Sequence, residues 1–460
     1  MQQFGVVGLA VMGKNLALNI RNHGFSVSGF SIDRPEVDAL AKYEDEKLVP
    51  TYTWQEFVAS LAKPRKILIM IKAGKPVDLT LAQLKPLLDA GDIIIDGGNS
   101  NFHDTNRRVK ALASAGIHFI GMGVSGGEEG ALNGPALMPG GDEAAFKQVE
   151  PILAAIAAKT PSGRPCVSYI GPEASGHYVK MVHNGIEYAI MQEVSEVYDL
   201  LRVAGKSNQE MSKIFAKWYQ GDLDAYLIEI TSKVLAQPDD LSSGEVIDRI
   251  LNVASYKGTG NWMLEDGVAL GAPISVIAEA VIGRFMSKQT QRSGQAPQLT
   301  SDVPADFVPN LEKALNLAQA VAYAQGFQQL TLAANAYNWG LRYPAIAQNW
   351  EAGCIIRSGM LQEIETAYAD QPKMGLLFEA PYFAQLMKAN LPALKQVIAL
   401  AMSAGVPTPT LSATLNYLES IFNPKLPANM IQGQRDYFGA HTYLRNDREG
   451  VFHTEWYAEK

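Results

Sequence analysis

The first third of the chain alternates short apolar runs with longer amphipathic segments, and this alternation limits the fold more than any other feature. The apolar runs are continuous and rich in Val and Ile, as in strands buried on both faces of a sheet. We expect strands at 4–7, 26–32, 67–71, 93–95 and 117–120, and helices at 15–22, 77–88 and 105–113. Strand and helix in alternation predict a doubly wound parallel sheet, an α/β domain of the Rossmann type.

The pattern changes after residue 160. Residues 160–165 are typical of a loop and 167–170 of a last strand, and beyond Gly176 the sequence is almost wholly helical in period. A large all-α region is therefore predicted, with a polar, proline-containing loop at 293–309. The residues from Gln432 onward are polar and aromatic without a clear period, which predicts an extended tail. We expect three parts, at 1–176, 177–431 and 432–460.

Composition excludes several classes of protein. The chain of 460 residues has a net charge of −8, which argues against broad nucleic-acid binding because phosphate backbones attract clustered Lys and Arg. Its two cysteines, Cys166 and Cys354, fit buried thiols in a reducing compartment, and no Cys and His spacing indicates a metal site. The start of the chain lacks the features of a signal peptide, and no apolar run is long enough for a bilayer. We therefore expect a cytoplasmic protein without a membrane partner.

A glycine-containing turn directly follows the first predicted strand and opens the first helix. Gly8 permits the tight turn, Gly13 allows close packing of helix on sheet, and Ala10 lets backbone N–H groups approach a pyrophosphate. A turn that only packs is the alternative, but its position in a βαβ unit favours cofactor binding. This fingerprint comprises Gly8, Leu9, Ala10, Val11, Met12 and Gly13.

The end of the second predicted strand reports on the ribose of such a cofactor. An acidic residue there favours NAD, whereas an Arg favours the 2′-phosphate of NADP. The chain has both, because Ser31 and Ile32 are followed by Asp33 and Arg34. The residues alone leave the choice of cofactor open.

Two glycine-rich loops follow later strands, at the edge where ligands of open α/β sheets bind. They are Asp-Gly-Gly-Asn-Ser at 96–100 and Val-Ser-Gly-Gly-Glu-Glu-Gly at 124–130. Glycine pairs expose backbone N–H groups, which bind carboxylates and phosphates. Two tight turns without a ligand are the alternative interpretation.

Four polar residues share one face of the helix that follows the predicted sheet. Lys180, His183, Asn184 and Glu187 fall at i, i+3, i+4 and i+7. A solvated polar ladder is one interpretation. The other is catalysis, since a lysine removed from water acts as a neutral base and a partly buried carboxyl stays protonated and acts as an acid.

Taken together, these motifs resemble the 6-phosphogluconate dehydrogenase family. The resemblance runs from residue 1 to the tail, whereas shorter 3-hydroxyacid dehydrogenases lack the long helical half. It is carried by the motifs at 8–13, 96–99, 125–130 and 180–187, by Tyr-Lys-Gly-Thr-Gly at 256–260, and by Gln-Arg-Asp-Tyr-Phe-Gly-Ala-His-Thr at 434–442.

The resemblance implies oxidative decarboxylation of 6-phosphogluconate to ribulose 5-phosphate and CO2, a step of the pentose phosphate pathway and of gluconate utilisation. It implies that Lys180 takes the C3 hydroxyl proton and later protonates the carbonyl oxygen, while Glu187 gives a proton to C1 of the enediol. It also implies a homodimer in which each tail reaches the neighbouring subunit's site. No metal is needed, because a β-keto acid already has its electron sink.

The resemblance also assigns binding residues. NADP is the implied cofactor, but most members have Asn-Arg-Thr where this chain has Ser31, Ile32 and Asp33, so only Arg34 can replace the usual arginine and NAD remains the alternative. The cofactor would contact the fingerprint, residues 31–34, Ile71, Lys72, Ala73 and Asn99. The substrate would contact Asn99, Ser125, Gly126, Gly127, His183, Asn184, Tyr188, Lys257, Thr259 and Arg284, with Arg435 and His441 from a second subunit.

Two other functions stay open from the sequence. One is a different 3-hydroxyacid dehydrogenase, which release of CO2 together with reduced cofactor would distinguish. The other is a dinucleotide-binding module without catalysis, against which the intact Lys180 and Glu187 argue.

Overall fold

The computed structural model describes residues 1–256, 258–289 and 303–457. It comprises two compact units, Met1–Ala413 and Thr414–Lys460, and helix α17 (Pro409–Ile421) contains the boundary between them. Lys257 and most of the loop predicted at 293–309 lie outside the described residues. No helix in the described part of the chain has the length and apolar character that a bilayer crossing requires.

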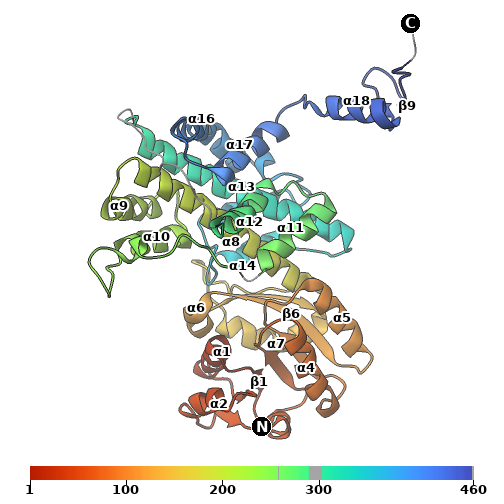
Figure 1. Ribbon diagram of the computed structural model, residues 1–460. Coiled ribbons are helices and arrows are strands. Elements are labelled where there is room, and N and C mark those ends of the chain that lie inside the picture. The colour runs from red at the N-terminus through yellow and green to blue at the C-terminus, as the bar shows by residue number, and fades with distance from the viewer. Residues whose placement is uncertain (257, 290–302, 458–460) are drawn as a thin grey trace. The chain divides into compact units, whose positions relative to one another are not determined.

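The first unit begins with a seven-stranded sheet, ordered β3-β2-β1-β4-β5-β6-β7 (Figure 1). The first six strands are parallel, and β7 pairs antiparallel with β6. The predicted doubly wound sheet is confirmed. Its strands are β1 (Phe4–Val7), β2 (Val27–Phe30), β3 (Leu48–Thr51), β4 (Lys66–Ile69), β5 (Ile93–Asp96), β6 (His118–Ser125) and β7 (Ala136–Gly141).

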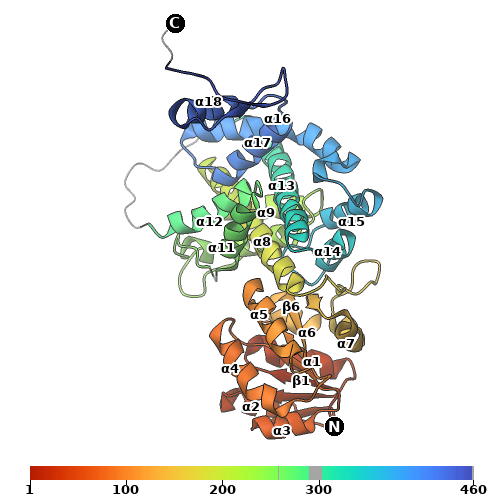
Figure 2. The same cartoon turned by 90° about the vertical axis from the view of Figure 1, so that its right-hand side faces the viewer.

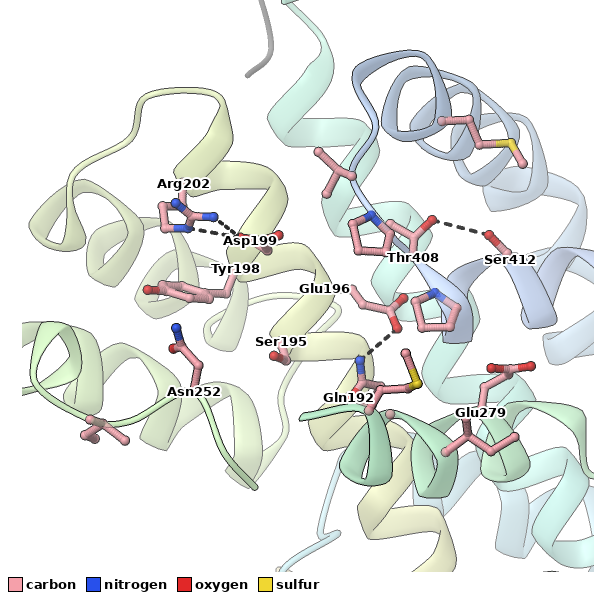
Figure 3. A pocket seen from close by; sticks show the side chains of 18 of the residues that line it. Gln192, Ser195, Glu196, Tyr198, Asp199, Arg202, Asn252, Glu279, Thr408 and Ser412 are labelled. Atoms are coloured by element: carbon pink, nitrogen blue, oxygen red, sulfur yellow. Dashed lines mark hydrogen bonds and ion pairs between the residues drawn. The ribbon is translucent and has the colours of Figure 1, made fainter. Parts of the chain in front are cut away.

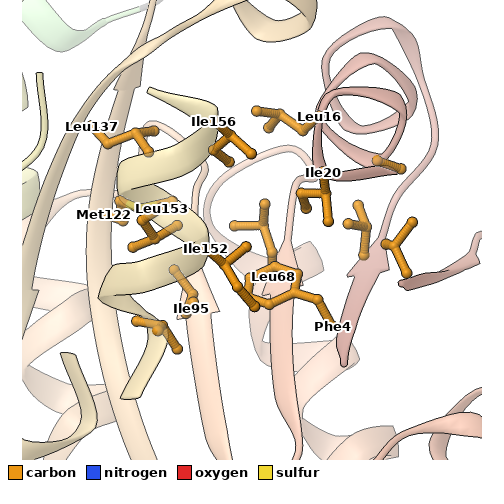
Figure 4. Packing of buried hydrophobic residues seen from close by; sticks show 14 of the residues in the cluster. Phe4, Leu16, Ile20, Leu68, Ile95, Met122, Leu137, Ile152, Leu153 and Ile156 are labelled. Atoms are coloured by element: carbon orange, nitrogen blue, oxygen red, sulfur yellow. The ribbon is translucent and has the colours of Figure 1, made fainter. Parts of the chain in front are cut away.

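Helices cover both faces of this sheet, because successive strand residues point to opposite sides. Ile93 and Ile95 join a cluster with apolar side chains of α1 and α7, part of which Figure 4 shows, whereas Ile94 joins a second cluster with α3, α4 and α5. The helices of this region are α1 (Val11–Asn22), α2 (Arg34–Ala41), α3 (Trp54–Ser60), α4 (Lys75–Leu84) with the 3₁₀ turn η1 (Lys85–Leu87), α5 (Phe102–Ala113), α6 (Gly127–Asn133) and α7 (Glu143–Ile156).

The strand predicted at 167–170 is wrong. This segment runs beside β7, with Leu137 N–H donating to Cys166 O and Ile170 N–H donating to Pro139 O, but it forms only an isolated bridge, at Val167, and no continuous strand. The seventh strand is instead β7, which the sequence did not indicate because Ala-Leu-Met-Pro-Gly-Gly lacks β-branched residues. Its proline is tolerated because β7 lies at the edge of the sheet.

The rest of the first unit is helical in its described residues, as predicted. Helix α8 contacts β6 and β7 and also α11, α12 and α13, so it joins the sheet to the helices above it (Figures 1 and 2). The loop predicted to end at 309 is wrong at its end, because α13 begins at Phe307 with a proline in its first turn. The helices are α8 (Ser175–Val203), α9 (Asn208–Tyr219), α10 (Tyr226–Ala236), η2 (Val246–Asp248), α11 (Thr259–Leu270), α12 (Ser275–Ser287), α13 (Phe307–Ala336), α14 (Tyr343–Trp350), α15 (Met360–Asp370), η3 (Leu377–Glu379), α16 (Pro381–Ala404) and α17.

The second unit is not an extended segment. Helix α18 (Ala428–Gly439) is followed by the short strands β8 (Tyr443–Leu444) and β9 (Val451–Phe452), which pair antiparallel. The sequence showed no apolar period from Gln432 onward because the buried side chain among the described residues there is a carboxylate, that of Asp436. It accepts hydrogen bonds from the backbone N–H groups of Thr442 and Thr454 and from Nε1 of Trp456, and it pairs with His453.

Candidate active site

Helix α8 is fixed to the end of β5 by a buried histidine that the sequence did not single out. His177 Nε2 lies 3.0 Å from the carbonyl oxygen of Asp96, and Nδ1 lies 2.7 Å from Oγ1 of Thr105. Because a carbonyl oxygen only accepts, Nε2 carries the proton and Nδ1 accepts from the threonine hydroxyl. Burial lowers the pKa of His177, so the ring is neutral. This contact holds α8 against the edge of the sheet where ligands bind.

Lys180 projects from the next turn of α8 and is buried. A Cβ on Gly123 of β6 would lie 2.3 Å from Cβ of Lys180, so only glycine lets helix and strand approach this closely. Burial lowers the pKa of the amine, and the nearby Glu187 carboxylate opposes this shift. The side chain is therefore poised to work as a neutral amine.

His183 lies beside this amine and is also buried. Its Nδ1 atom is 3.3 Å from Nζ of Lys180 and 3.2 Å from Oδ1 of Asn184, and its Nε2 atom is 3.2 Å from Oγ of Ser125. Burial, and then the charge of Lys180, hold the pKa of His183 well below its usual value. A neutral imidazole thus connects the lysine to the last residue of β6.

Glu187 completes the polar face of α8. Its Oε2 atom lies 3.8 Å from Nδ1 of His183, and the side chain is largely buried. Burial raises the pKa of the carboxyl, against the opposing charges of Lys180 and Arg284. One helix face therefore presents an amine that tends to lose its proton and a carboxyl that tends to keep one.

Further polar groups extend this face toward α11 and α12. Asn184 Nδ2 donates to Oγ1 of Thr259 over 3.1 Å. The guanidinium of Arg284 lies 3.7 Å from the centre of the Tyr188 ring, and it also donates to the carbonyl oxygen of Ser255 over 2.8 Å. Lys257 lies outside the described residues, and Arg435 and His441 belong to the second unit.

The fingerprint turn has the geometry of a dinucleotide site. Gly8 has φ +89°, and a Cβ on Gly13 would lie 1.8 Å from the carbonyl oxygen of Gly8, so both positions require glycine. The N-cap residue of α1, Ala10, makes no side-chain hydrogen bond to the helix. The first N–H groups of α1 therefore have no side-chain cap and fit the phosphates of a dinucleotide.

Four of the other predicted cofactor contacts, Ile71, Lys72, Ala73 and Asn99, line one cavity of about 650 Å³, whereas the predicted contacts at 31–34 do not line it. The sequence missed one of its walls, Trp262, which comes from α11 and lies three residues after Thr259. The one feature of the sequence that could have indicated Trp262 is its position next to the motif at 256–260. The cavity is lined by Ile71, Lys72, Ala73, Gly74, Asn99, Asn101, Asp104 and Trp262.

A larger cavity, of about 970 Å³, lies beyond Glu187 along α8, and neither Lys180 nor Glu187 lines it (Figure 3). One of its walls is Glu196, whose carboxylate accepts from Gln192 Nε2 and from the backbone N–H groups of Thr410 and Leu411. The acid and base candidates therefore lie outside this cavity. Within the described ranges, no group of three or more His, Cys, Asp or Glu side chains is arranged to hold a metal ion.

A dinucleotide fingerprint, combined with a buried lysine and a buried carboxyl on the adjoining helix, defines a nicotinamide-dependent dehydrogenase. Comparison with known proteins identifies the family. Residues 3–171 match the model of the NAD binding domain of 6-phosphogluconate dehydrogenase, and residues 176–456 match that of its C-terminal domain. The chain belongs to the 6-phosphogluconate dehydrogenase family.

Full-length relatives agree with this assignment. The decarboxylating 6-phosphogluconate dehydrogenase of Escherichia coli (strain K12) is 50% identical over 465 residues, covering 99% of each chain. The NADP(+)-dependent, decarboxylating 6-phosphogluconate dehydrogenase of Bacillus subtilis (strain 168) is 48% identical, with the same coverage. A solved structure of the Plasmodium falciparum 6-phosphogluconate dehydrogenase, studied with NADP+ and with 6-phosphogluconate, has a TM-score of 0.94 at 38% identity and covers 99% of this chain and 100% of its own.

Proposed function

We propose that this chain oxidises 6-phosphogluconate at C3 with NADP, releases CO2 and forms ribulose 5-phosphate, with Lys180 as base and Glu187 as acid. The family and its full-length relatives support the reaction. The observation that carries the residue roles is the buried face of α8, where Nζ of Lys180 and Oε2 of Glu187 flank the same neutral imidazole at 3.3 and 3.8 Å.

Lys180 acts first in this scheme. As a neutral amine it takes the proton of the C3 hydroxyl while the C3 hydrogen leaves as hydride. NADP, held by the fingerprint at 8–13 and the loop at 71–73, supplies the hydride acceptor when bound. Lys180 then carries the proton as an ammonium.

The same lysine assists the loss of CO2. The 3-keto acid is a β-keto acid, so the electrons of the breaking C–C bond flow into the C3 carbonyl, and the Lys180 ammonium returns its proton to that oxygen. Glu187, whose pKa burial raises, then gives a proton to C1 of the enediol while Lys180 takes back the proton of the former C3 hydroxyl, and the ketose results. The substrate thus loses one hydride and CO2, the proton gained at C1 replaces the hydroxyl proton lost to Lys180, and a proton passed from Lys180 to Glu187 restores both groups.

The neighbouring groups position the substrate. Asn99, Ser125, the backbone N–H groups of Gly126 and Gly127, His183 and Asn184 hold its carboxylate and hydroxyls. Tyr188, Lys257, Thr259 and Arg284 hold its phosphate. The contact of Arg284 with the Tyr188 ring supports this role, because stacking orients a guanidinium for bidentate binding of phosphate.

The active protein is a cytoplasmic homodimer in this proposal, and Arg435 and His441 reach the phosphate of the neighbouring subunit's substrate. The exposed side chains of the second unit support this arrangement. Met430, Ile431 and Phe438 are 65%, 61% and 71% exposed, so three large apolar side chains of this unit are open to solvent. A second copy of the chain would cover them.

One assay tests the reaction. The purified chain is mixed with 6-phosphogluconate and NADP, and reduced cofactor and CO2 are followed together. We expect equal amounts of both. Reduced cofactor without CO2 would indicate a different 3-hydroxyacid dehydrogenase, and absence of both would indicate a module without this activity.

A further inference from the structure

An acidic side chain lies where the ribose of a dinucleotide is recognised. Glu36, in the first turn of α2, accepts two hydrogen bonds at its Oε2 atom. One comes from the backbone N–H of Leu9 in the fingerprint turn, over 3.1 Å, and the other from the hydroxyl of Ser31 at the end of β2, over 2.7 Å. Glu36 thus joins the turn that follows β1 to the residue that follows β2.

This position has a known consequence in Rossmann folds. A carboxylate at the end of the second strand accepts a hydrogen bond from the adenosine ribose 2′-hydroxyl of NAD, whereas a nearby Arg favours the 2′-phosphate of NADP. Directly after β2, Ser31 is neutral and Ile32 is apolar and 87% exposed, and the carboxylate of Asp33 that comes next is also on an exposed side chain. Glu36 reaches the same place from the following helix.

Its second carboxylate oxygen remains available. Oε1 makes no hydrogen bond with the described residues, and the side chain is half-buried rather than enclosed. Two bonds to Oε2 therefore hold the carboxylate in place and leave Oε1 for a hydroxyl donor.

The surrounding charges disfavour a 2′-phosphate. Arg34 is the single cation among residues 31–38, and its guanidinium lies 5.1 Å from the centre of the Tyr52 ring. The carboxylates of Asp33, Glu36 and Asp38 belong to the same eight residues, and Asp38 accepts a hydrogen bond from the Tyr52 hydroxyl. A phosphate dianion placed here would meet one guanidinium and several like charges.

We propose that Glu36 accepts a hydrogen bond from the ribose 2′-hydroxyl of NAD and opposes the 2′-phosphate of NADP, so that this chain binds NAD alongside NADP. Glu36 is then a specificity-determining residue of the dinucleotide site. This inference rests on the dinucleotide site of the proposed function, but it concerns the choice between two cofactors and not the reaction.

Calorimetric titration of the full chain with NAD and with NADP, without substrate, tests the role. The variant Glu36→Gln keeps an oxygen that accepts from Leu9 and Ser31, but it removes the charge. We expect NAD to bind more weakly and NADP more tightly, so that the ratio of the NAD to the NADP dissociation constant rises by about tenfold or more. Glu46→Gln, an exposed site before β3, is the control for net charge and should leave the ratio unchanged.

The outcomes separate this inference from the proposed function. A wild-type chain that binds NADP but not NAD would overturn the inference, as would an unchanged ratio in Glu36→Gln. Arg34→Ala should weaken NADP selectively, which would support a site with one opposing and one attracting charge. Failure of both dinucleotides to bind the wild-type chain would instead count against the proposed function itself.

Discussion

Nζ of Lys180 lies 3.3 Å from Nδ1 of His183, and both side chains are buried. The pKa of His183 is held well below its usual value, so the imidazole offers the amine a hydrogen bond but no balancing charge. Glu187, on the same helix face, is then the nearby group that favours the ammonium. Burial therefore shifts the amine toward its neutral form, which is the form that a catalytic base requires.

Lys180→Met should abolish oxidation. The substitution keeps most of the buried volume but removes the group that takes the hydroxyl proton, so we expect the rate of hydride transfer to fall by about 10³-fold or more. Single-turnover measurement of reduced cofactor checks this step directly. Lys110→Met, at an exposed site on α5, should leave the rate unchanged. A Lys180→Met variant that retains hydride transfer would contradict the assignment.

Glu187→Gln should act at a later step. The amide cannot donate a carboxyl proton to C1 of the enediol, so we expect reduced cofactor and CO2 to form in a first turnover while release of ribulose 5-phosphate slows by about 10²-fold. With the reaction run in deuterated water, the rate at which deuterium enters C1 of ribulose 5-phosphate measures this slowed protonation. If this variant failed at hydride transfer to the same extent as Lys180→Met, the division of roles between the two residues would be wrong.

The pH dependence of oxidation supplies a further test of the same pair. Hydride transfer needs the neutral amine, so its rate rises with pH through the pKa of Lys180, which burial places below the usual 10.5. At pH values where Glu187 is ionised, its carboxylate raises that pKa, and Glu187→Gln removes this charge. The rising limb of the pH profile should therefore move to lower pH in Glu187→Gln. The rising limb should keep its position in Glu150→Gln, which changes an exposed site on α7. A rising limb that moved to higher pH in Glu187→Gln would contradict the proposed coupling.

The sequence predicted the parts of the fold that depend on local pattern. The apolar runs at β1, β2, β4, β5 and β6 were recognised because these strands are buried on both faces. The edge strand β7 was not, since its pairing depends on β6 and not on its own residues. The face of α8 that carries Lys180 and Glu187 followed from helical spacing alone.

Contacts between distant segments were not predictable from local pattern. The bond from Leu9 N–H to Glu36 requires that the turn after β1 and the first turn of α2 lie side by side, which only the folded sheet brings about. The same holds for the link from His177 to Asp96 and for the place of Trp262 in the cofactor cavity. The structure from Gln432 onward escaped prediction for another reason, because the buried side chain among the described residues there is the carboxylate of Asp436.

Asp436→Asn should loosen the second unit. Burial opposes ionisation of this carboxyl most strongly, but hydrogen bonds from His453, Thr454, Trp456 and Thr442 outweigh it and lower the pKa to about 2. A group with a lowered pKa contributes stability that is present above its ordinary value of 3.8 and is lost as the pH falls through about 2. At neutral pH the full contribution is present, and the substitution removes the ionised acceptor of four donors.

Limited proteolysis measures this loosening. We expect cleavage between residues 440 and 457 to become faster by about tenfold in Asp436→Asn, together with lower turnover, because Arg435 and His441 lose their fixed surroundings. Asp447→Asn removes an exposed carboxylate that pairs with Arg445 in the same unit, and it should cleave at the wild-type rate. Equal cleavage of both variants would show that the Asp436 cluster does not order this unit.

Mixed dimers test whether the tail completes the neighbouring site. Lys180→Met removes the base, and Arg435→Ala removes the tail cation, so each homodimer should be inactive or nearly so. A dimer with one subunit of each kind has one site that combines an intact Lys180 from one chain with an intact Arg435 from the other. Two differently tagged variants allow this dimer to be purified, and it should show about half the turnover of the wild-type dimer, because one of two equivalent sites is complete.

Truncation before Gln432 should abolish turnover while the sheet remains folded, as dinucleotide binding would report. Full activity of the truncated chain, or an inactive mixed dimer, would mean that each subunit builds its site from its own residues.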